Sequence, residues 1–360
     1  MHTPVTPLPF GIGPTLFRTR TFETPPTEEE REENRRGDKV AGYITVLIVS
    51  LVFLFDLDGK AYRYFFPKAL IFDSPKFTPF SIVSKEDVSP TSFIVTLRPR
   101  SLVDNPKLAK SDPYEKEWGT GPWSVEFKQP QLQIARSYTP LPPRENDTTG
   151  DLRFLIRREA NGEMSRYLAR LAVGEQVELR GPHSELELPN EVTDVVFLAG
   201  GTGIAPALQV AHTLLQVRKP SENLPNIHII WANRRREDCI GGADLHGAAN
   251  TDRSEGTIVQ ELREFQERYP DNVRVDYLVD EEGKFLDQKT ISRVTKREPE
   301  VKHQAVSTTI GSKLMFVSGP EGFVNFLAGP KKYWDGKEVQ GELGGLIGKM
   351  GIRDWKVWKQ

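Results

Sequence analysis

GGTGIAP, at residues 200–206, is the stretch that decides the fold of this chain. It follows the apolar run VVFLA at residues 195–199 and precedes a helical pattern of apolar residues. A buried strand, a glycine turn and a helix start together form a phosphate cradle. Glycines let the backbone approach a ligand closely, and the first helix amides face an anion. The alternative for this stretch alone is a plain strand-to-helix turn.

Strand and helix patterns alternate from residue 190 onward, which predicts an open parallel sheet with the glycine turn after its first strand. Residues 280–310 are polar and weakly patterned, so we expect a loop with one helix there. The expected strands cover residues 195–199, 227–232, 273–278 and 314–317, and the expected helices cover residues 205–217 and 258–268.

Short alternating strands precede this region and predict a small antiparallel barrel. One short helix is expected at residues 164–171, and residues 99–122 are expected to form a long surface loop because they are rich in Pro, Asp, Lys and Gly. The expected barrel strands cover residues 80–83, 92–97, 123–127, 132–136, 152–157 and 176–180.

Composition narrows the chemistry. The 360 residues are enough for two domains and a tail, and a net charge of −2 argues against a nucleic-acid partner bound through a basic field. The single cysteine, Cys239, excludes an internal disulfide, a thiolate zinc cluster and a four-cysteine iron–sulfur module. The six histidines show no metal-ligand spacing, so no metal ligands are predicted. Redox chemistry would therefore need a bound organic cofactor.

The N-terminal region differs in kind from the rest. Residues 1–22 hold no Asp or Glu, which suits an organelle-targeting presequence or a disordered arm, and residues 1–39 are assigned to this segment. The run VAGYITVLIVSLVFLF at residues 40–55 is uncharged and would reach about 24 Å as a helix at 1.5 Å per residue. We expect a transmembrane helix over residues 40–56; the alternative is a buried core element.

Three further motifs carry chemical meaning. In RSYTP at residues 136–140, an arginine can pair with a phosphate, an aromatic ring can pack on a nucleotide, and a hydroxyl can hydrogen-bond a flavin ring. GEMS at residues 162–165 opens a helix and suits an anion. SGP at residues 318–320 ends a late strand and faces the glycine turn. Taken singly, the first could be strand-end packing and the second a helix cap.

The order of these motifs, together with RGP at residues 180–182, resembles the ferredoxin–NADP reductase superfamily, and the closest branch looks like the cytochrome b5 reductases. The resemblance covers residues 78–330. It implies a two-domain ferredoxin-reductase fold, with an antiparallel β-barrel FAD domain at residues 66–189 and an α/β parallel-sheet NAD(P)-binding domain at residues 190–360. In that family, hydride passes from NADH or NADPH to the flavin between the domains.

The resemblance also implies roles for individual residues. The residues at the reacting centre would be Thr139, Thr202 and Ser318. The FAD-binding residues would be Arg136, Ser137, Tyr138, Thr139, Gly162, Met164, Ser165 and Thr202. The NAD(P)-binding residues would be Gly200, Gly201, Gly203, Asp238, Gly319 and Pro320.

Two departures from the family pattern bear on activity, and one further segment bears on the choice of coenzyme. Ser318 stands where a cysteine is usual, which puts the hydride-transfer rate in doubt, and Glu163 replaces a common lysine beside the pyrophosphate. Asp238 favours the ribose hydroxyls of NADH, whereas Arg235 and Arg236 would suit the 2′-phosphate of NADPH. We expect NADH as the coenzyme. The other interpretation of residues 233–238 is a plain solvated loop.

The tail and the apolar run carry a narrower resemblance. GELGGL at residues 341–346 and WKVW at residues 355–358 are similar to the mitochondrial flavoproteins called cytochrome c mitochondrial import factors. That implies the inner mitochondrial membrane, with the catalytic part facing the intermembrane space; the outer or endoplasmic reticulum membrane is the alternative. The implied acceptor is ferric haem during cytochrome c maturation, with cytochrome c or its haem lyase as partner. The alternatives are an NADH-cytochrome b5 reductase and a non-catalytic scaffold.

Overall fold

The computed structural model describes residue 39 and residues 75–108, 111–218, 224–242, 255–296 and 312–360. All of these except residue 39 belong to one compact unit, Ala69–Gln360. The predicted transmembrane helix at residues 40–56 and the N-terminal segment before it lie outside the described residues. Within the described residues, no helix is long and apolar enough to cross a membrane.

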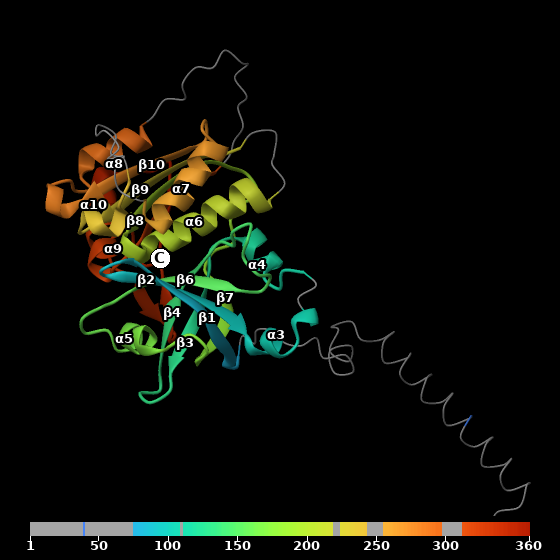
Figure 1. Cartoon of the computed structure of the whole chain (residues 1–360). Coiled ribbons are helices and arrows are strands. Elements are labelled where there is room, and N and C mark those ends of the chain that lie inside the picture. The colour runs from blue at the N-terminus through green and yellow to red at the C-terminus, as the bar shows by residue number, and fades with distance from the viewer. Residues whose placement is uncertain (1–38, 40–74, 109–110, 219–223, 243–254, 297–311) are drawn as a thin grey trace, which may run out of the picture. The chain divides into compact units, whose positions relative to one another are not determined.

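The N-terminal lobe is an antiparallel sheet with the strand order β4-β3-β7-β1-β2-β6-β5 (Figure 1). Alternating apolar residues fill its interior, as the pattern predicts; Phe80, Phe127 and Phe154 are completely buried there. Its strands are β1 (Thr78–Ser89), β2 (Ser92–Pro99), β3 (Trp123–Gln129), β4 (Ile134–Tyr138), β5 (Pro140–Leu141), β6 (Leu152–Arg157) and β7 (Gln176–Ser184), and helix α5 spans Glu163–Arg170.

Thr139 joins the two edges of this sheet. β4 forms one edge and β5 the other, and Thr139 is the single residue between them. Two Cα steps span at most about 7 Å, so the edges must lie side by side where the chain passes from one to the other. The sheet therefore curls into a barrel, and we call this lobe the barrel.

The C-terminal lobe is built on a parallel sheet with the order β10-β9-β8-β11-β14, in which β8 carries the glycine turn at the centre of the sheet. A separate hairpin pairs β12 with β13. The strands are β8 (Val192–Gly200), β9 (Asn226–Asn233), β10 (Val273–Val279), β11 (Ser312–Ser318), β12 (Lys332–Trp334), β13 (Lys337–Val339) and β14 (Lys356–Lys359). The tail thus supplies an edge strand, and Trp358 packs against the core.

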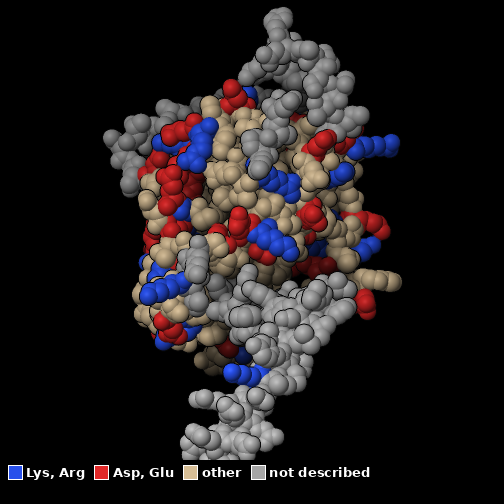
Figure 2. Space-filling model, turned by 90° about the vertical axis from the view of Figure 1, so that its right-hand side faces the viewer, with Lys and Arg blue, Asp and Glu red and all other residues tan. Residues whose placement is uncertain are grey.

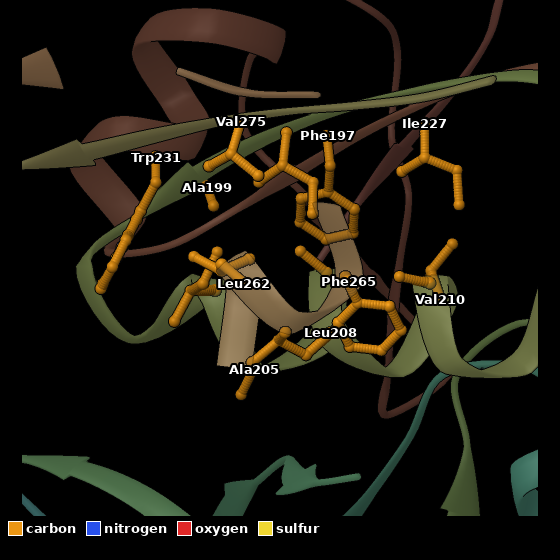
Figure 3. Packing of buried hydrophobic residues seen from close by; sticks show 14 of the residues in the cluster. Phe197, Ala199, Ala205, Leu208, Val210, Ile227, Trp231, Leu262, Phe265 and Val275 are labelled. Atoms are coloured by element: carbon orange, nitrogen blue, oxygen red, sulfur yellow. The ribbon is translucent and has the colours of Figure 1, made fainter. Parts of the chain in front are cut away.

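Helices cover both faces of the parallel sheet. Odd-numbered residues of β8 pack with α6 and α7 (Figure 3), whereas Val196 and Leu198 face α8, α9 and α10. This three-layer arrangement explains why the strands are apolar on both sides. The helices are α6 (Ile204–His212), α7 (Thr257–Arg268), α8 (Gln288–Thr295), α9 (Glu321–Ala328) and α10 (Gly345–Met350), and the 3-10 turns are η2 (Gly201–Gly203), η4 (Arg236–Cys239) and η5 (Asp280–Glu282).

Two sequence predictions need correction. Residues 99–122 are not a plain surface loop: they contain α3 (Arg100–Asp104), the 3-10 turn η1 (Pro106–Leu108) and α4 (Glu115–Thr120), and they bury Tyr114 and Trp118 in the barrel core. The helix predicted at residues 205–217 is α-helical only to His212 and continues as the π-helical turn η3 (Thr213–Val217). Long-range burial of two aromatic rings outweighs the loop-like composition of residues 99–122.

The surface carries both signs of charge without separation on the face drawn in Figure 2, where basic and acidic residues alternate. This mixture agrees with the net charge of −2. A charged partner approaching that face would therefore meet no extended field of a single sign.

Candidate functional site

The predicted flavin motif lies along β4, at the edge of the barrel. Arg136 and Ser137 are exposed there, while Tyr138 points inward and packs edge-on against Phe127, with ring centroids 4.9 Å apart. Burial raises the pKa of Tyr138 to about 12, so its phenol stays neutral. The guanidinium of Arg136 donates to the carbonyl of its neighbour Ala135 at 2.8 Å and is otherwise open to solvent, where it can meet an anion.

The start of helix α5 is the second predicted phosphate contact. Met164 and Ser165 are buried, and Glu163 is exposed. The Ser165 hydroxyl lies inside the turn: it accepts a hydrogen bond from Glu159 N at 3.2 Å and donates to the Gly162 carbonyl at 3.3 Å. Its role here is to hold the turn, which leaves the first backbone N–H groups of α5 as the donors for an anion. The exposed carboxylate of Glu163 would repel an anion bound there.

The glycine turn is shaped by its neighbours in the parallel sheet. A Cβ at Gly203 would overlap the carbonyl oxygen of Ser318 and lie 2.8 Å from Gly319 N. A Cβ at Gly319 would in turn lie 3.0 Å from the Cα of Gly200. The turn after β8 and the turn after β11 therefore touch backbone to backbone, and Ser318, 4% exposed, is enclosed beside them. Gly203 and Gly319 are thus required for this packing.

Gly201 has a different role. Its φ of 53° lies in the left-handed region, which favours glycine. A Cβ added to Gly201 would point toward Arg157 and lie 3.5 Å from its Nη1. The indole of Trp231 donates to the Gly201 carbonyl at 2.8 Å and fixes the turn. Thr202, the next residue, is partly exposed and lines the same small cavity as Gly201 and Arg157.

Gln209 brings the two motif-bearing edges together. Its fully buried amide accepts a hydrogen bond from Trp123 N and donates to the Pro140 carbonyl, both at 2.9 Å. Gln209 lies on α6, the helix that follows the glycine turn, and Pro140 follows Thr139. One side chain therefore binds the nucleotide cradle of the parallel sheet to the flavin motif of the barrel.

A second connection between the lobes is ionic. Glu261 of α7 accepts a hydrogen bond from Arg153 of β6 at 2.8 Å and also contacts Arg144. Arg153 and Glu261 are both nearly completely buried. This cluster and the Gln209 amide hold the lobes in one fixed arrangement, because a buried charge cannot lose its partner without a large cost.

Asp238 lies against the barrel instead of standing in the open. Its Oδ1 accepts hydrogen bonds from Ser89 Oγ at 2.7 Å and from Thr91 Oγ1 at 2.5 Å. Arg235, exposed, and Arg236, which donates to Glu282 at 2.7 Å, lie on the same segment. Arg236 is thus engaged within its own lobe. The solvated-loop interpretation of Asp238 is wrong, and its role toward ribose stays a prediction.

Several residues that lie beside these motifs belong to other elements of the fold, and the sequence analysis did not predict a role for them. A small cavity between the lobes is lined by Arg157, Asn233 and Trp231 in addition to Thr202 and Asp238. Asn233 closes β9, and the carboxyl ends of parallel strands meet at one edge, so its position was open to inference. Ser89, Thr91 and Arg157 come from the barrel and gave no local signal.

The residues present fit two nucleotide cofactors. An exposed arginine and the start of α5 flank β4, and a glycine turn with an inward-facing arginine stands across the lobe interface. These are the donors that phosphates prefer. FAD, when bound, accepts a hydride and releases its electrons one at a time. The chain's part is to bind, to orient and to exclude water.

Comparison with known proteins agrees with this arrangement. Residues 123–188 match the oxidoreductase FAD-binding domain family, and residues 197–328 match the oxidoreductase NAD-binding domain family. NADH-cytochrome b5 reductase 2 of Kluyveromyces lactis is 29% identical over 228 residues, covering 63% of this chain and 67% of that protein. NADH-cytochrome b5 reductase 1 of Candida albicans is 33% identical over 150 residues, covering 41% and 44%.

The fold has a solved counterpart. The cytochrome b5 reductase domain of Ulva prolifera nitrate reductase superposes with a TM-score of 0.53 at 21% identity, over 80% of this chain and 99% of that one. The chain therefore belongs to the ferredoxin–NADP reductase superfamily and has cytochrome b5 reductase-like relatives. Within that class, it is an FAD-dependent oxidoreductase that uses a nicotinamide nucleotide.

Proposed function

We propose that the protein is a membrane-anchored NADH reductase that passes electrons through FAD to a haem protein. The observation that carries the proposal is the buried amide of Gln209, which ties the glycine-turn helix to the backbone beside Thr139. A hydride donor and a flavin need fixed proximity, and a rigid link between their binding edges provides it. The names of the relatives support NADH as donor and a cytochrome as acceptor.

Two acceptors are consistent with the chain. A cytochrome b5 is favoured by the relatives, which are called NADH-cytochrome b5 reductases. Ferric haem during mitochondrial cytochrome c maturation, with cytochrome c or its haem lyase as partner, is favoured by the tail motifs at residues 341–346 and 355–358. The proposed location is the inner mitochondrial membrane, with the catalytic lobes in the intermembrane space, which the apolar run at residues 40–56 supports.

The decisive experiment uses the full-length chain purified in detergent. We expect a yellow protein whose flavin absorbance is bleached anaerobically by NADH and recovers when a ferric acceptor is added. Cytochrome b5 and ferric haem are offered separately, and the faster reoxidation identifies the acceptor class. A colourless protein that takes up no FAD would contradict the proposal and leave the scaffold role. Protease protection in isolated mitochondria tests the location.

A further inference from the structure

The cavity between the lobes is small and closely bounded. It measures about 20 Å³ and is lined from the barrel by Ser89, Ser92 and Arg157, and from the parallel-sheet lobe by Asn233 and Asp238. A space of this size holds one water molecule or one hydroxyl group. Neither lobe forms the cavity alone.

Among the residues that the structure describes, two polar atoms of this lining are buried and have no hydrogen-bond partner. They are Oδ2 of Asp238 and Nδ2 of Asn233, whose side chain is 3% exposed. Leaving such atoms unpaired is costly, and a buried site that does so is suited to a ligand. Because one atom accepts and the other donates, the matching group is a hydroxyl. A phosphate dianion would accept from Asn233 but would be repelled by the carboxylate.

The barrel fixes the orientation of that carboxylate. Ser89 Oγ and Thr91 Oγ1 both donate to Oδ1 of Asp238, which leaves Oδ2 to face the cavity. Nη1 of Arg157 lies 4.0 Å from Oδ2, which is too far to fill the hydrogen-bonding capacity of that oxygen. The two hydroxyls lie near the turn between β1 and β2, about 150 residues before Asp238 in the chain.

We propose that Ser89 and Thr91 are positioning residues for coenzyme selection. By holding Asp238, they orient its free oxygen opposite the amide of Asn233, where it can accept a hydrogen bond from a ribose hydroxyl of the dinucleotide. In the same position the carboxylate repels a 2′-phosphate. Selection between NADH and NADPH is then shared by both lobes. This inference rests on the proposed use of NADH and adds the barrel residues that enforce it.

The test compares the double variant Ser89→Ala/Thr91→Val with the wild-type full-length chain in detergent. Titration calorimetry measures the binding of NAD⁺ and NADP⁺, and steady-state rates with ferricyanide give kcat and KM for NADH and NADPH. We expect the preference for NAD⁺ over NADP⁺ to fall about tenfold through a higher Kd and KM for the NAD forms, with kcat little changed. Thr91→Ser, which keeps the hydroxyl, should retain the wild-type preference.

A matched control separates selection from looser packing. Thr213→Val removes another interlobe hydroxyl, which donates to the Trp118 carbonyl at 2.8 Å away from this cavity, and it should leave the preference unchanged. An unchanged preference in the double variant, or an equal loss in Thr213→Val, overturns the inference. If the double variant does not fold, each single variant is expected to lose about threefold, and no loss overturns the inference equally. A wild-type protein that uses neither coenzyme fails the proposed function instead.

Discussion

The side-chain amide of Gln209 lies 2.9 Å from the carbonyl oxygen of Pro140, in an interface that buries the Gln209 side chain completely. The same amide satisfies Trp123 N. One polar side chain in an apolar interface thus fixes the spacing of two lobes that must present two cofactors to each other.

Replacing Gln209 by leucine should therefore loosen the lobes as well as the fold. Two buried backbone groups would lose their partners, which is worth about 2–4 kcal/mol of the free energy of unfolding. Urea denaturation measures that loss, and stopped-flow reduction by NADH should slow in parallel. Gln260→Leu, at an exposed position of α7, is the control and should change neither. A stable Gln209→Leu protein would show that the link is dispensable.

The ion pair between Arg153 and Glu261 predicts a second loss of stability. Glu261→Gln keeps the shape and removes the charge, so within the described part of the chain Arg153 keeps only Asp147 as an anionic partner, at 2.9 Å. Breaking one side of a buried pair costs about 3–5 kcal/mol, and the remaining partner places this case near the lower end. Urea denaturation of Glu261→Gln and of the exposed control Glu264→Gln gives the comparison; equal midpoints would refute the prediction.

Gly203 and Gly322 form a matched pair of test positions, because replacing each by alanine should change the stability of the protein in opposite directions. Gly203→Ala forces a methyl group onto the Ser318 carbonyl and should destabilise the protein by about 1–3 kcal/mol. Gly322→Ala in helix α9 meets nothing within 4 Å and should stabilise it by about 0.5–1 kcal/mol. Thermal melting of both variants tests the pair. Similar effects at the two positions would mean that the two turns do not touch as described.

Arg136 should carry part of the affinity for FAD. Removing a charged donor to phosphate costs about 1.5–3 kcal/mol, so Arg136→Ala should raise the Kd for FAD roughly tenfold to a hundredfold. Fluorescence titration of the deflavinated protein measures this change. Arg100→Ala serves as the control because Arg100 is exposed and pairs with Asp104 in its own helix. A loss of FAD affinity in both variants would point to a general charge effect.

His212 predicts how stability changes with pH. Burial lowers the pKa of His212, whose Nδ1 lies 2.7 Å from Oε1 of Gln216. Above the unfolded value near 6.5, the imidazole is neutral in both states and contributes no pH dependence. As the pH falls below that value, the unfolded chain binds the proton first and stability is lost until the folded pKa is passed. Urea titrations at pH 7.5 and 5.5 should show a smaller fall in His212→Gln.

The sequence predicted elements well wherever the signal was local. β6 at Leu152–Arg157 matches its predicted bounds at both ends, and the glycine turn lies between β8 and α6 as the apolar runs on either side indicated. The helices within residues 99–122 were missed because Tyr114 and Trp118 are buried by distant strands, which composition does not record. The hydrogen bonds from Ser89 and Thr91 to Asp238 join residues 147 to 149 positions apart, and no local pattern encodes them.

The passage of the chain through Thr139 has a consequence for the protein without its flavin. The barrel closes where its two edge strands meet; Arg136 lies on one of them, β4, and Thr139 is the residue that connects β4 to β5. A ligand bound by both residues would act as a reversible cross-link at this closure. Its free energy of binding would therefore add to the free energy that is needed to separate β4 from β5. Amide hydrogens of β4 and β5 should then exchange fastest in the deflavinated protein and slow selectively when FAD is restored.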